Sequence, residues 1–346
     1  MGEKTVNSTF ASSARHFFVV NPVCFDSRQK MEAVIAGIHR FFNEPDNSLL
    51  KTPQNYAVHI SRFPRDAIGA IRRFASAVPS GAPLRVYAVG GDGILFDCLN
   101  GVMGLPNVEL GIMPYGNQND FYRVFGKKDR SLFNSLEAQT RAPSVPVDAA
   151  YCGGNYALSH CMIGIEPIFA ASIKRIQNFP FMKRLISSFS PALTVSYLCL
   201  LAAMNSEVAK QNYRLWIDDE DLSGMYFLIP IMNASWYGGH QYYSDVDPMD
   251  GYLDIIASSA ISVLRLFRKV KAQREFRLGD RDAAGYYKKN YDLVTYRRAK
   301  KVLVTSESPL MFNLDGELFY DKSVMAEIKP AAVRIIDPNL VKGVRS

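Results

Sequence analysis

Three aspartates lie at regular intervals in the first half of the chain. Asp92 sits in the stretch Gly90-Gly91-Asp92-Gly93, Asp120 follows it by 28 residues, and Asp148 follows Asp120 by another 28. The interval is close to the length of one strand plus one helix. Three carboxylates at successive strand ends would converge on one edge of a sheet, where they could hold a metal ion through water. Taken singly, each aspartate is more often a cap or turn residue.

The glycines around Asp92 are typical of a phosphate site. Glycine lets the backbone approach a phosphate closely, and a following helix offers its free N–H groups. An aspartate at that place repels phosphate unless a cation lies between them. The four residues therefore favour a Mg²⁺-linked nucleotide phosphate, although a plain Gly-Asp turn explains them equally well.

The elements that would position these residues alternate between strand and helix. Apolar runs and helical spacing predict strand 16–20, helix 30–43, strand 56–60, helix 65–78, strand 85–89, helix 94–104 and strand 108–114. This alternation is typical of a parallel sheet with crossover helices. After about residue 147 the pattern changes to strands joined by short turns, interrupted by helical stretches near 168–208 and 261–276. We therefore expect a second, mainly antiparallel domain.

Composition sets the broad class of the protein. The chain has 346 residues, 48% apolar and 21% charged, with a net charge of +7. These values fit a two-domain globular protein with an anionic partner. Five scattered cysteines without a CxxC pair argue against a zinc site, and with no secretory signal they favour a reducing, cytosolic setting. The apolar run 192–204 is shorter than the roughly 20 residues that span a bilayer, so we expect a buried helix there, with an interfacial helix as the alternative.

Two acidic motifs occur in the second half of the chain. The sequence Asn-Leu-Asp-Gly-Glu at 313–317 places Asp-Gly between apolar runs, which is a strong signal for a hairpin turn. By itself this motif favours the turn over a catalytic role. The sequence DVDPMDGYLD at 245–254 puts carboxylates on a tight turn, which suits either a hard cation or a solvated acidic loop.

Taken together and in order, six motifs resemble the diacylglycerol kinase catalytic family, which includes bacterial soluble lipid kinases and sphingosine kinases. The motifs are Asn21-Pro22, GGDG at 90–93, GNQNDF at 116–121, NASWYGG at 233–239, DPMDGYLDI at 247–255 and NLDGE at 313–317. The resemblance implies an α/β, Rossmann-like nucleotide-binding domain over 1–147, joined by 327–346, and a β-rich, sandwich-like domain over 148–326, with a cleft between them. It also implies transfer of the γ-phosphoryl of ATP to the hydroxyl of diacylglycerol or a related lipid, with Mg²⁺.

The resemblance assigns roles to individual residues. Asp315 would be the general base, Glu317 would support it or bind metal, and Asp92 would join them in catalysis. Asp247 and Asp250 would bind a structural Mg²⁺ through their carboxylates, and Tyr252 through its backbone carbonyl. The residues implied at the nucleotide are Asn21, Ser61, Gly90, Gly91, Asp92, Gly93, Gly116, Asn119, Asp120 and Asp148, of which the three aspartates would form a network with Mg²⁺.

Several positions depart from the family's usual pattern. Ile94 stands where a hydroxyl residue is common, Asn117 and Gln118 replace small residues, and Tyr122 replaces alanine. The first loop reads NPVCF, without the usual glycine. These changes crowd the phosphate side and keep two alternatives open: a nucleotide- or lipid-binding relative without turnover, and a kinase of a soluble substrate related to NAD kinases.

Two basic stretches suggest a membrane face. Residues 265–301 carry 13 Lys or Arg against 4 Asp or Glu, and residues 174–189 mix four cations with phenylalanines. Such stretches suit anionic headgroups, although a solvated basic surface explains them as well. Because no nucleic-acid motif accompanies the charge, we expect no nucleic-acid partner. The sequence thus predicts a cytoplasmic protein at the membrane periphery that binds ATP and a lipid, and it leaves a homodimer open.

Overall fold

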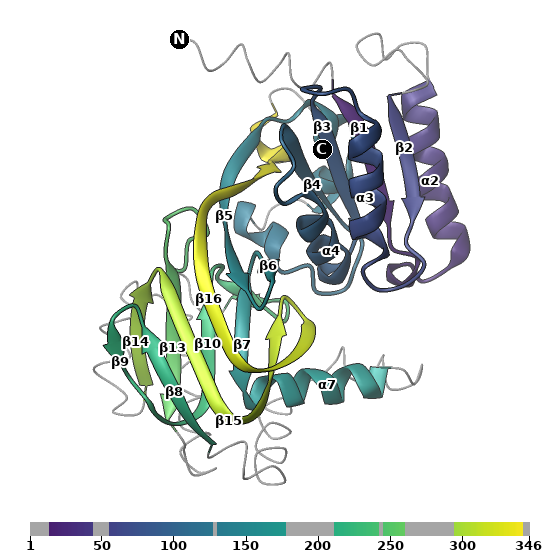
Figure 1. Ribbon diagram of the computed structural model, residues 1–346. Helices are drawn as coiled ribbons and strands as arrows, with labels where there is room; N and C mark the ends of the chain where they lie inside the picture. The colour runs from purple at the N-terminus through teal and green to yellow at the C-terminus, as the bar shows by residue number, and fades with distance from the viewer. Residues whose placement is uncertain are drawn as a thin grey trace. The chain divides into compact units, whose positions relative to one another are not determined.

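The computed structural model describes residues 14–43, 55–126, 130–177, 211–241, 245–259 and 294–341 (Figure 1). The chain divides into two compact units. Unit 1 comprises residues 1–148 together with 331–346, and unit 2 comprises residues 149–330.

Unit 1 is built on a parallel sheet. Its strands are β1 (Arg15–Val20), β2 (Tyr56–Ile60), β3 (Leu84–Gly90), β4 (Val108–Pro114) and the end of β16 (Glu317–Ile336). β1 pairs in parallel with both β2 and β3, β3 pairs with β4, and the last residues of β16 pair with β4. The four strand predictions for this half of the chain and the parallel arrangement are confirmed.

Helices pack on both faces of this sheet, which is why its strands read as continuous apolar runs. The helices are α2 (Arg28–Asn43), α3 (Asp66–Ala77), α4 (Asp92–Val102), α5 (Arg130–Asn134) and α6 (Leu136–Arg141). Phe18 and Val20 of β1 pack in one cluster with Ile38 and Phe42 of α2. Phe17, which points to the other face, stacks on Phe74 of α3 with ring centroids 4.4 Å apart. The predicted Rossmann-like arrangement of unit 1 is therefore confirmed.

One ion pair is buried in the core of unit 1. Arg85 of β3 is 1% exposed and its Nη2 lies 2.7 Å from Oε2 of Glu109 on β4. The same guanidinium donates to the backbone oxygens of Thr140 and Ala142, at 2.7 and 2.9 Å. Arg85 thus ties two central strands to the chain that follows α6.

Unit 2 is mainly antiparallel, as the change of pattern after residue 147 predicted. Neighbouring strands follow the order β14, β13, β10, β7, β15 and β16, and β8 pairs with both β10 and β15. The elements are β5 (Ser144–Cys152, which begins in unit 1), β6 (Asn155–Ala157), β7 (His160–Gly164), α7 (Ile165–Gln177), β8 (Gln211–Ile217), β9 (Glu220–Asp221), β10 (Gly224–Met232), β11 (Trp236–Tyr237), β12 (His240–Gln241), β13 (Leu253–Ser259), β14 (Val294–Ala299) and β15 (Lys301–Leu314).

Some expectations for unit 2 change with the structure. The stretch from Lys301 to Leu314 forms one long strand, β15, whose pairing with β16 is irregular between Thr305 and Leu310. The helical stretch expected near 168–208 appears as α7, and its remainder, 178–208, lies outside the described residues, as do the helix expected at 261–276 and the apolar run 192–204. Among the described residues, no helix is both long and apolar enough to cross a bilayer.

Candidate functional site

The glycine-rich turn lies where β3 ends and α4 begins. β3 is buried throughout, Gly91 is the N-cap of α4, and Asp92 is the first helical residue. Gly93 follows inside the first turn. A carboxylate in the first turn is stabilised by the positive end of the helix dipole. The glycine-rich turn therefore lies at the carboxyl end of a parallel strand, as predicted. Open α/β sheets bind their ligands at such strand ends.

A second loop, at the end of β4, packs directly against this turn. Backbone N–H groups of Tyr115 and Gly116 donate to the carbonyl of Gly90 at 2.8 and 3.0 Å. A Cβ atom on Gly116 would lie 2.5 Å from the Cα of Gly91, a distance that real Cβ contacts do not reach. Glycine is required at 116 because the two backbones touch there.

Arg130, at the start of α5, holds the second loop through hydrogen bonds to its backbone. Its Nε donates to the carbonyl of Pro114 at 2.6 Å and its Nη2 to that of Gly116 at 2.7 Å. The sequence analysis missed this residue, because an arginine outside the motifs gives no signal of its own.

Asp92 and Asp120 come together across the two loops. The backbone N–H of Asp120 donates to Oδ1 of Asp92 at 2.8 Å. Burial, and then the charge of Asp120, raise the pKa of Asp92 to about 7. The raised pKa means that negative charge on Asp92 is unfavourable beside Asp120. The pair therefore fits a divalent cation, since Mg²⁺ is commonly held by one or two carboxylates together with phosphate oxygens.

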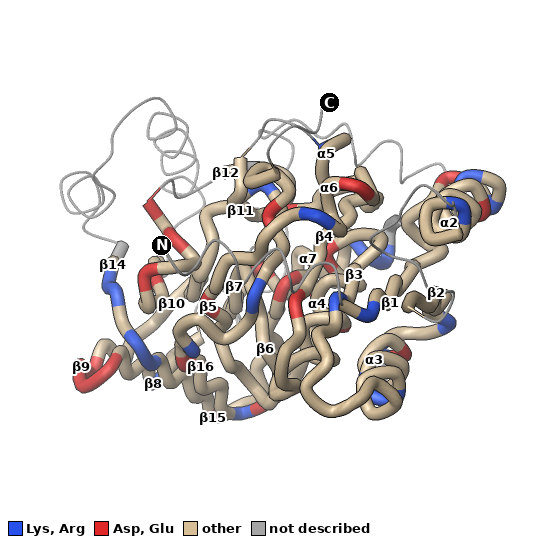
Figure 2. The backbone as a smooth tube through the Cα atoms, turned by 90° about the horizontal axis from the view of Figure 1, so that it is seen from above, with Lys and Arg blue, Asp and Glu red and all other residues tan. Residues whose placement is uncertain are grey.

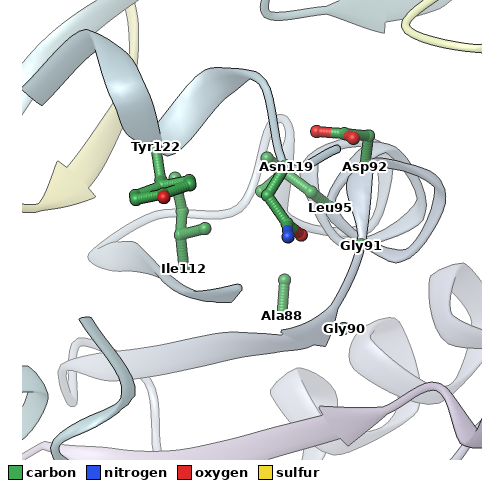
Figure 3. Close-up of a pocket in the computed structure, with 8 residues that line it drawn as sticks. All are labelled: Ala88, Gly90, Gly91, Asp92, Leu95, Ile112, Asn119 and Tyr122. Carbon is green, nitrogen blue, oxygen red and sulfur yellow. The ribbon is translucent and has the colours of Figure 1, made fainter. Parts of the chain in front are cut away.

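A small pocket adjoins the pair (Figure 3). It is lined by Ala88, Gly90, Gly91, Asp92, Leu95, Ile112, Asn119 and Tyr122. Asn119 lies between Asp92 and Tyr122 in this view, adopts a left-handed backbone conformation with φ 49°, and donates from its side chain to the carbonyl of Gly116. Its polar groups thus hold the second loop in shape at the pocket wall.

The residues expected at the ends of β1 and β2 adopt local turns. The side chain of Asn21 accepts a hydrogen bond from the N–H of Val23 at 3.1 Å and caps a short 3-10 turn. Ser61 follows β2, and its N–H donates to the carbonyl of Val20 at 2.9 Å. Both residues therefore lie at the carboxyl edge of the unit 1 sheet, as predicted.

Asp148 has a different environment from the other two aspartates. It is 3% exposed, and its Oδ1 accepts a hydrogen bond from the N–H of Ala331 at 2.7 Å. Within the described ranges, no group of three or more His, Cys, Asp or Glu side chains is arranged to hold a metal ion. The structure thus brings Asp92 and Asp120 together and gives Asp148 a contact with β16.

The departures from the family pattern differ in their surroundings. Ile94 of α4 is 2% exposed and packs against the glycine-rich turn, because a Cβ atom on Gly90 would lie 2.8 Å from its Cγ2. Asn117 and Gln118 are exposed. Tyr122 does line the pocket.

In unit 2, Asp315 occupies the turn between β15 and β16. Asp315 and Gly316 have φ of 46° and 91°, and Leu314 pairs with Glu317 across them, as in a two-residue hairpin of type I′. The carboxylate accepts backbone hydrogen bonds from Leu158 at 2.6 Å and from Ser159 and His160 at 2.9 Å each. The motif is therefore a hairpin turn, and the turn holds a buried, oriented carboxylate.

Other polar side chains surround this turn and were missed by the sequence analysis. Glu166 of α7 accepts hydrogen bonds from Asn313 and from the hydroxyl of Tyr237. Lys174 of the same helix lies 3.4 Å from Oε1 of Glu317. Asn313 and Tyr237 lie inside quoted motifs, whereas Glu166 is one acid in an apolar run and gave no signal.

An arginine pairs with two carboxylates of the acidic loop 245–254. Oδ1 of Asp247 and of Asp250 each accept a backbone N–H at 3.0 Å, from Met249 and Tyr252 respectively. Arg298 of β14 forms an ion pair with Asp250, and its guanidinium lies 4.8 Å from the centre of the Tyr252 ring. The metal role of Asp247, Asp250 and Tyr252 stays a prediction.

Figure 2 shows acidic residues at β9 and basic residues along β14, two strands of unit 2. The acidic turn at β9 and the arginines of β14 are joined by Arg297 and Glu220, whose Nε and Oε2 are 2.6 Å apart. Of the basic stretch 265–301, only residues 294–301 are described. Arg297 in this part pairs with Glu220.

Family models match almost the whole chain. Residues 17–152 match the diacylglycerol kinase catalytic domain, and residues 187–337 match the YegS C-terminal NAD kinase beta sandwich-like domain. The chain therefore belongs to the diacylglycerol kinase catalytic-domain family and carries a kinase-like catalytic domain followed by a YegS-type domain.

Individual relatives agree with this assignment. A Staphylococcus aureus (strain JH9) protein named "Putative lipid kinase" is 24% identical over 262 residues, which cover 73% of this chain and 77% of the relative. A protein of the same name from Staphylococcus haemolyticus (strain JCSC1435) is 22% identical over 307 residues, 86% of this chain and 91% of the relative. A crystal structure titled as a diacylglycerol kinase from Bacillus anthracis str. Sterne has a TM-score of 0.62 at 19% identity, covering 94% of this chain and 98% of that one. At this identity the likeness demonstrates a shared fold.

Proposed function

We propose that the protein is an ATP- and Mg²⁺-dependent lipid kinase that phosphorylates the hydroxyl of diacylglycerol or a related lipid alcohol. The observation that carries the proposal is the packing of two glycine loops at the carboxyl ends of β3 and β4, with Asp92 and Asp120 beside them. The names of the staphylococcal relatives support the lipid as the acceptor class.

Unit 1 binds the nucleotide in this proposal. The backbone of Gly90, Gly91, Gly93 and Gly116 lies against the phosphates, and Asn21, Ser61 and Asn119 line the same strand edge. Asp92 and Asp120 would hold Mg²⁺, with Asp148 assigned to the same network by the family resemblance. A cation held there would neutralise charge on the phosphate oxygens.

Unit 2 supplies the base. The lipid oxygen forms a bond to the γ-phosphorus, the bond from that phosphorus to the bridging β-phosphate oxygen breaks, and ADP leaves. The hydroxyl proton passes to the carboxylate of Asp315, with Glu317 beside it. Three backbone N–H donors favour the ionised carboxylate, which is the form that a base requires.

The test is transfer of labelled γ-phosphate from Mg-ATP to lipids in mixed micelles. Diacylglycerol, monoacylglycerol, sphingosine and ceramide are assayed separately, and NAD serves as a soluble acceptor. A labelled lipid is the expected product. A labelled NAD product, or tight Mg-ATP binding without any product, would contradict the lipid kinase and favour one of the two alternatives.

The variant Asp315→Asn tests the base. It should lower turnover by about 1,000-fold while Mg-ATP binds as in the wild type, because general-base catalysis contributes about 10²–10⁴-fold. Asp321→Asn, an exposed change on the neighbouring strand, is the matched control and should behave as wild type. Full activity of Asp315→Asn would remove this residue from catalysis.

A further inference from the structure

A buried carboxylate that the proposed reaction does not use lies at the start of α7. Glu166 is 6% exposed, and its two oxygens accept hydrogen bonds from the side-chain amide of Asn313 at 2.9 and 3.1 Å. The hydroxyl of Tyr237, on β11, donates to the same carboxylate. Burying a carboxylate costs free energy, and the hydrogen bonds to Glu166 offset part of that cost. The question is what this buried group contributes.

Asn313 links Glu166 to the turn that carries Asp315. Its side-chain oxygen accepts a hydrogen bond from the N–H of Gly316 at 2.8 Å, and the residue is 1% exposed. An ionised carboxylate only accepts hydrogen bonds. Ionised Glu166 therefore fixes the orientation of the Asn313 amide, with the NH₂ toward Glu166 and the oxygen toward Gly316.

A protonated Glu166 would no longer fix the orientation of the Asn313 amide. It could donate its own proton to Asn313, and the amide could then turn its oxygen toward Glu166 and its NH₂ toward the turn. In that orientation two donors, the Asn313 amide and the Gly316 N–H, would face each other. The turn would shift to relieve this conflict, and Asp315 would move with it.

We propose that Glu166 is a positioning residue for Asp315, acting through Asn313 and Gly316. The inference rests on the proposed function, in which Asp315 accepts the proton of the lipid hydroxyl. Glu166 itself touches neither the proton nor the nucleotide in this scheme. Lys174, from the same helix, adds a second contact to the turn through Glu317.

The ionisation of Glu166 falls near neutral pH. Burial raises its pKa to about 7, against the lowering effects of Tyr237, Asn313 and Lys174. The titratable groups that face it are Lys174 of α7, Tyr237 of β11 and Cys161 of β7. His160 of β7 lies against Tyr237 and stays neutral, because burial lowers its pKa to about 3. The network is therefore intact above pH 7 and is lost as the pH falls through that value.

The test uses steady-state kinetics on the full chain. Glu166→Gln should lower kcat about 100-fold, the loss that a small misplacement of a catalytic group produces. The KM for ATP should stay unchanged. At saturating Mg-ATP, where the bound cation would keep Asp92 ionised, the acid limb of the kcat profile near pH 7 should disappear. Glu327→Gln, a change at a partly exposed residue of β16, is the matched control and should leave all of these values as in the wild type.

A second variant is independent of how well Glu166→Gln folds. Tyr237→Phe removes one hydrogen bond to the carboxylate, so the acid limb should move to higher pH. Unchanged kcat and an unchanged acid limb in Glu166→Gln, or an unmoved limb in Tyr237→Phe, would overturn the positioning role. Asp315→Asn is measured in parallel. If that variant is fully active, the proposed base fails and the positioning role fails with it. If it is inactive, Asp315 is retained as the base, and the Glu166 variant tests the positioning role separately.

Discussion

Two aspartates at the start of α4 and after β4 set the chemistry of unit 1 at the scale of single residues. Their carboxylates lie close enough that the charge of Asp120 raises the pKa of Asp92. Such a pair is unfavourable in the nucleotide-free protein and becomes favourable when a cation binds. In the proposed function, the same contact that costs stability in the absence of ligand would favour a metal-bound phosphate.

This cost leads to a prediction about pH. The pKa of Asp92 is about 7 in the folded protein against 3.8 as its ordinary value, so the folded state binds the proton more tightly. Stability from this group is complete below 3.8 and is lost as the pH rises through 7. Asp92→Asn should therefore raise the unfolding temperature at pH 8 more than at pH 5, while abolishing turnover.

Thermal unfolding at the two pH values, with and without Mg²⁺, checks this expectation. Wild-type protein should gain stability from Mg²⁺ at pH 8, and Asp92→Asn should gain much less. Asp26→Asn, an exposed aspartate of unit 1, is the control. A lower unfolding temperature for Asp92→Asn at pH 8 would contradict the assigned pKa.

At the scale of elements, the buried pair of Arg85 and Glu109 holds β3 and β4 to the segment after α6. Arg85→Met removes the ion pair with buried Glu109 and the donors to Thr140 and Ala142. Glu109 keeps a hydrogen bond from Ser144. We expect a loss of about 3–5 kcal/mol in the free energy of unfolding, measured in urea. Glu32→Gln, which breaks the exposed pair with Arg28, should change it by less than about 1 kcal/mol. Equal effects of the two variants would contradict this account.

The elements of unit 1 were predictable because each strand is a continuous apolar run bounded by turn residues. The turn at Asp315 and Gly316 was predictable because Asp-Gly between apolar runs favours a hairpin turn. Contacts between distant segments were not: Asp148 bonds to Ala331, 183 residues away, and no periodicity encodes that pairing. Glu166 escaped notice because its role depends on Asn313, 147 residues further on.

At the scale of the whole molecule, the net charge of +7 predicts attraction to anionic lipid surfaces. Vesicles that contain phosphatidylglycerol should raise turnover of the lipid acceptor relative to phosphatidylcholine vesicles. The gain should shrink between about 0.05 and 0.5 M salt, because exposed charges are screened. Equal turnover on both vesicles at low salt would show that the basic charge serves another purpose.

The path of β16 has a consequence for biosynthesis. Residues 331–336 complete the sheet of unit 1 beside β4, and Ile335 and Ile336 are fully buried there. At about 5–20 residues per second, a ribosome that has made Asp148 needs roughly 10–40 s more to reach these residues. Throughout that interval β4 lacks its partner on one edge. The nascent unit 1 is therefore incomplete until after unit 2 has been synthesised.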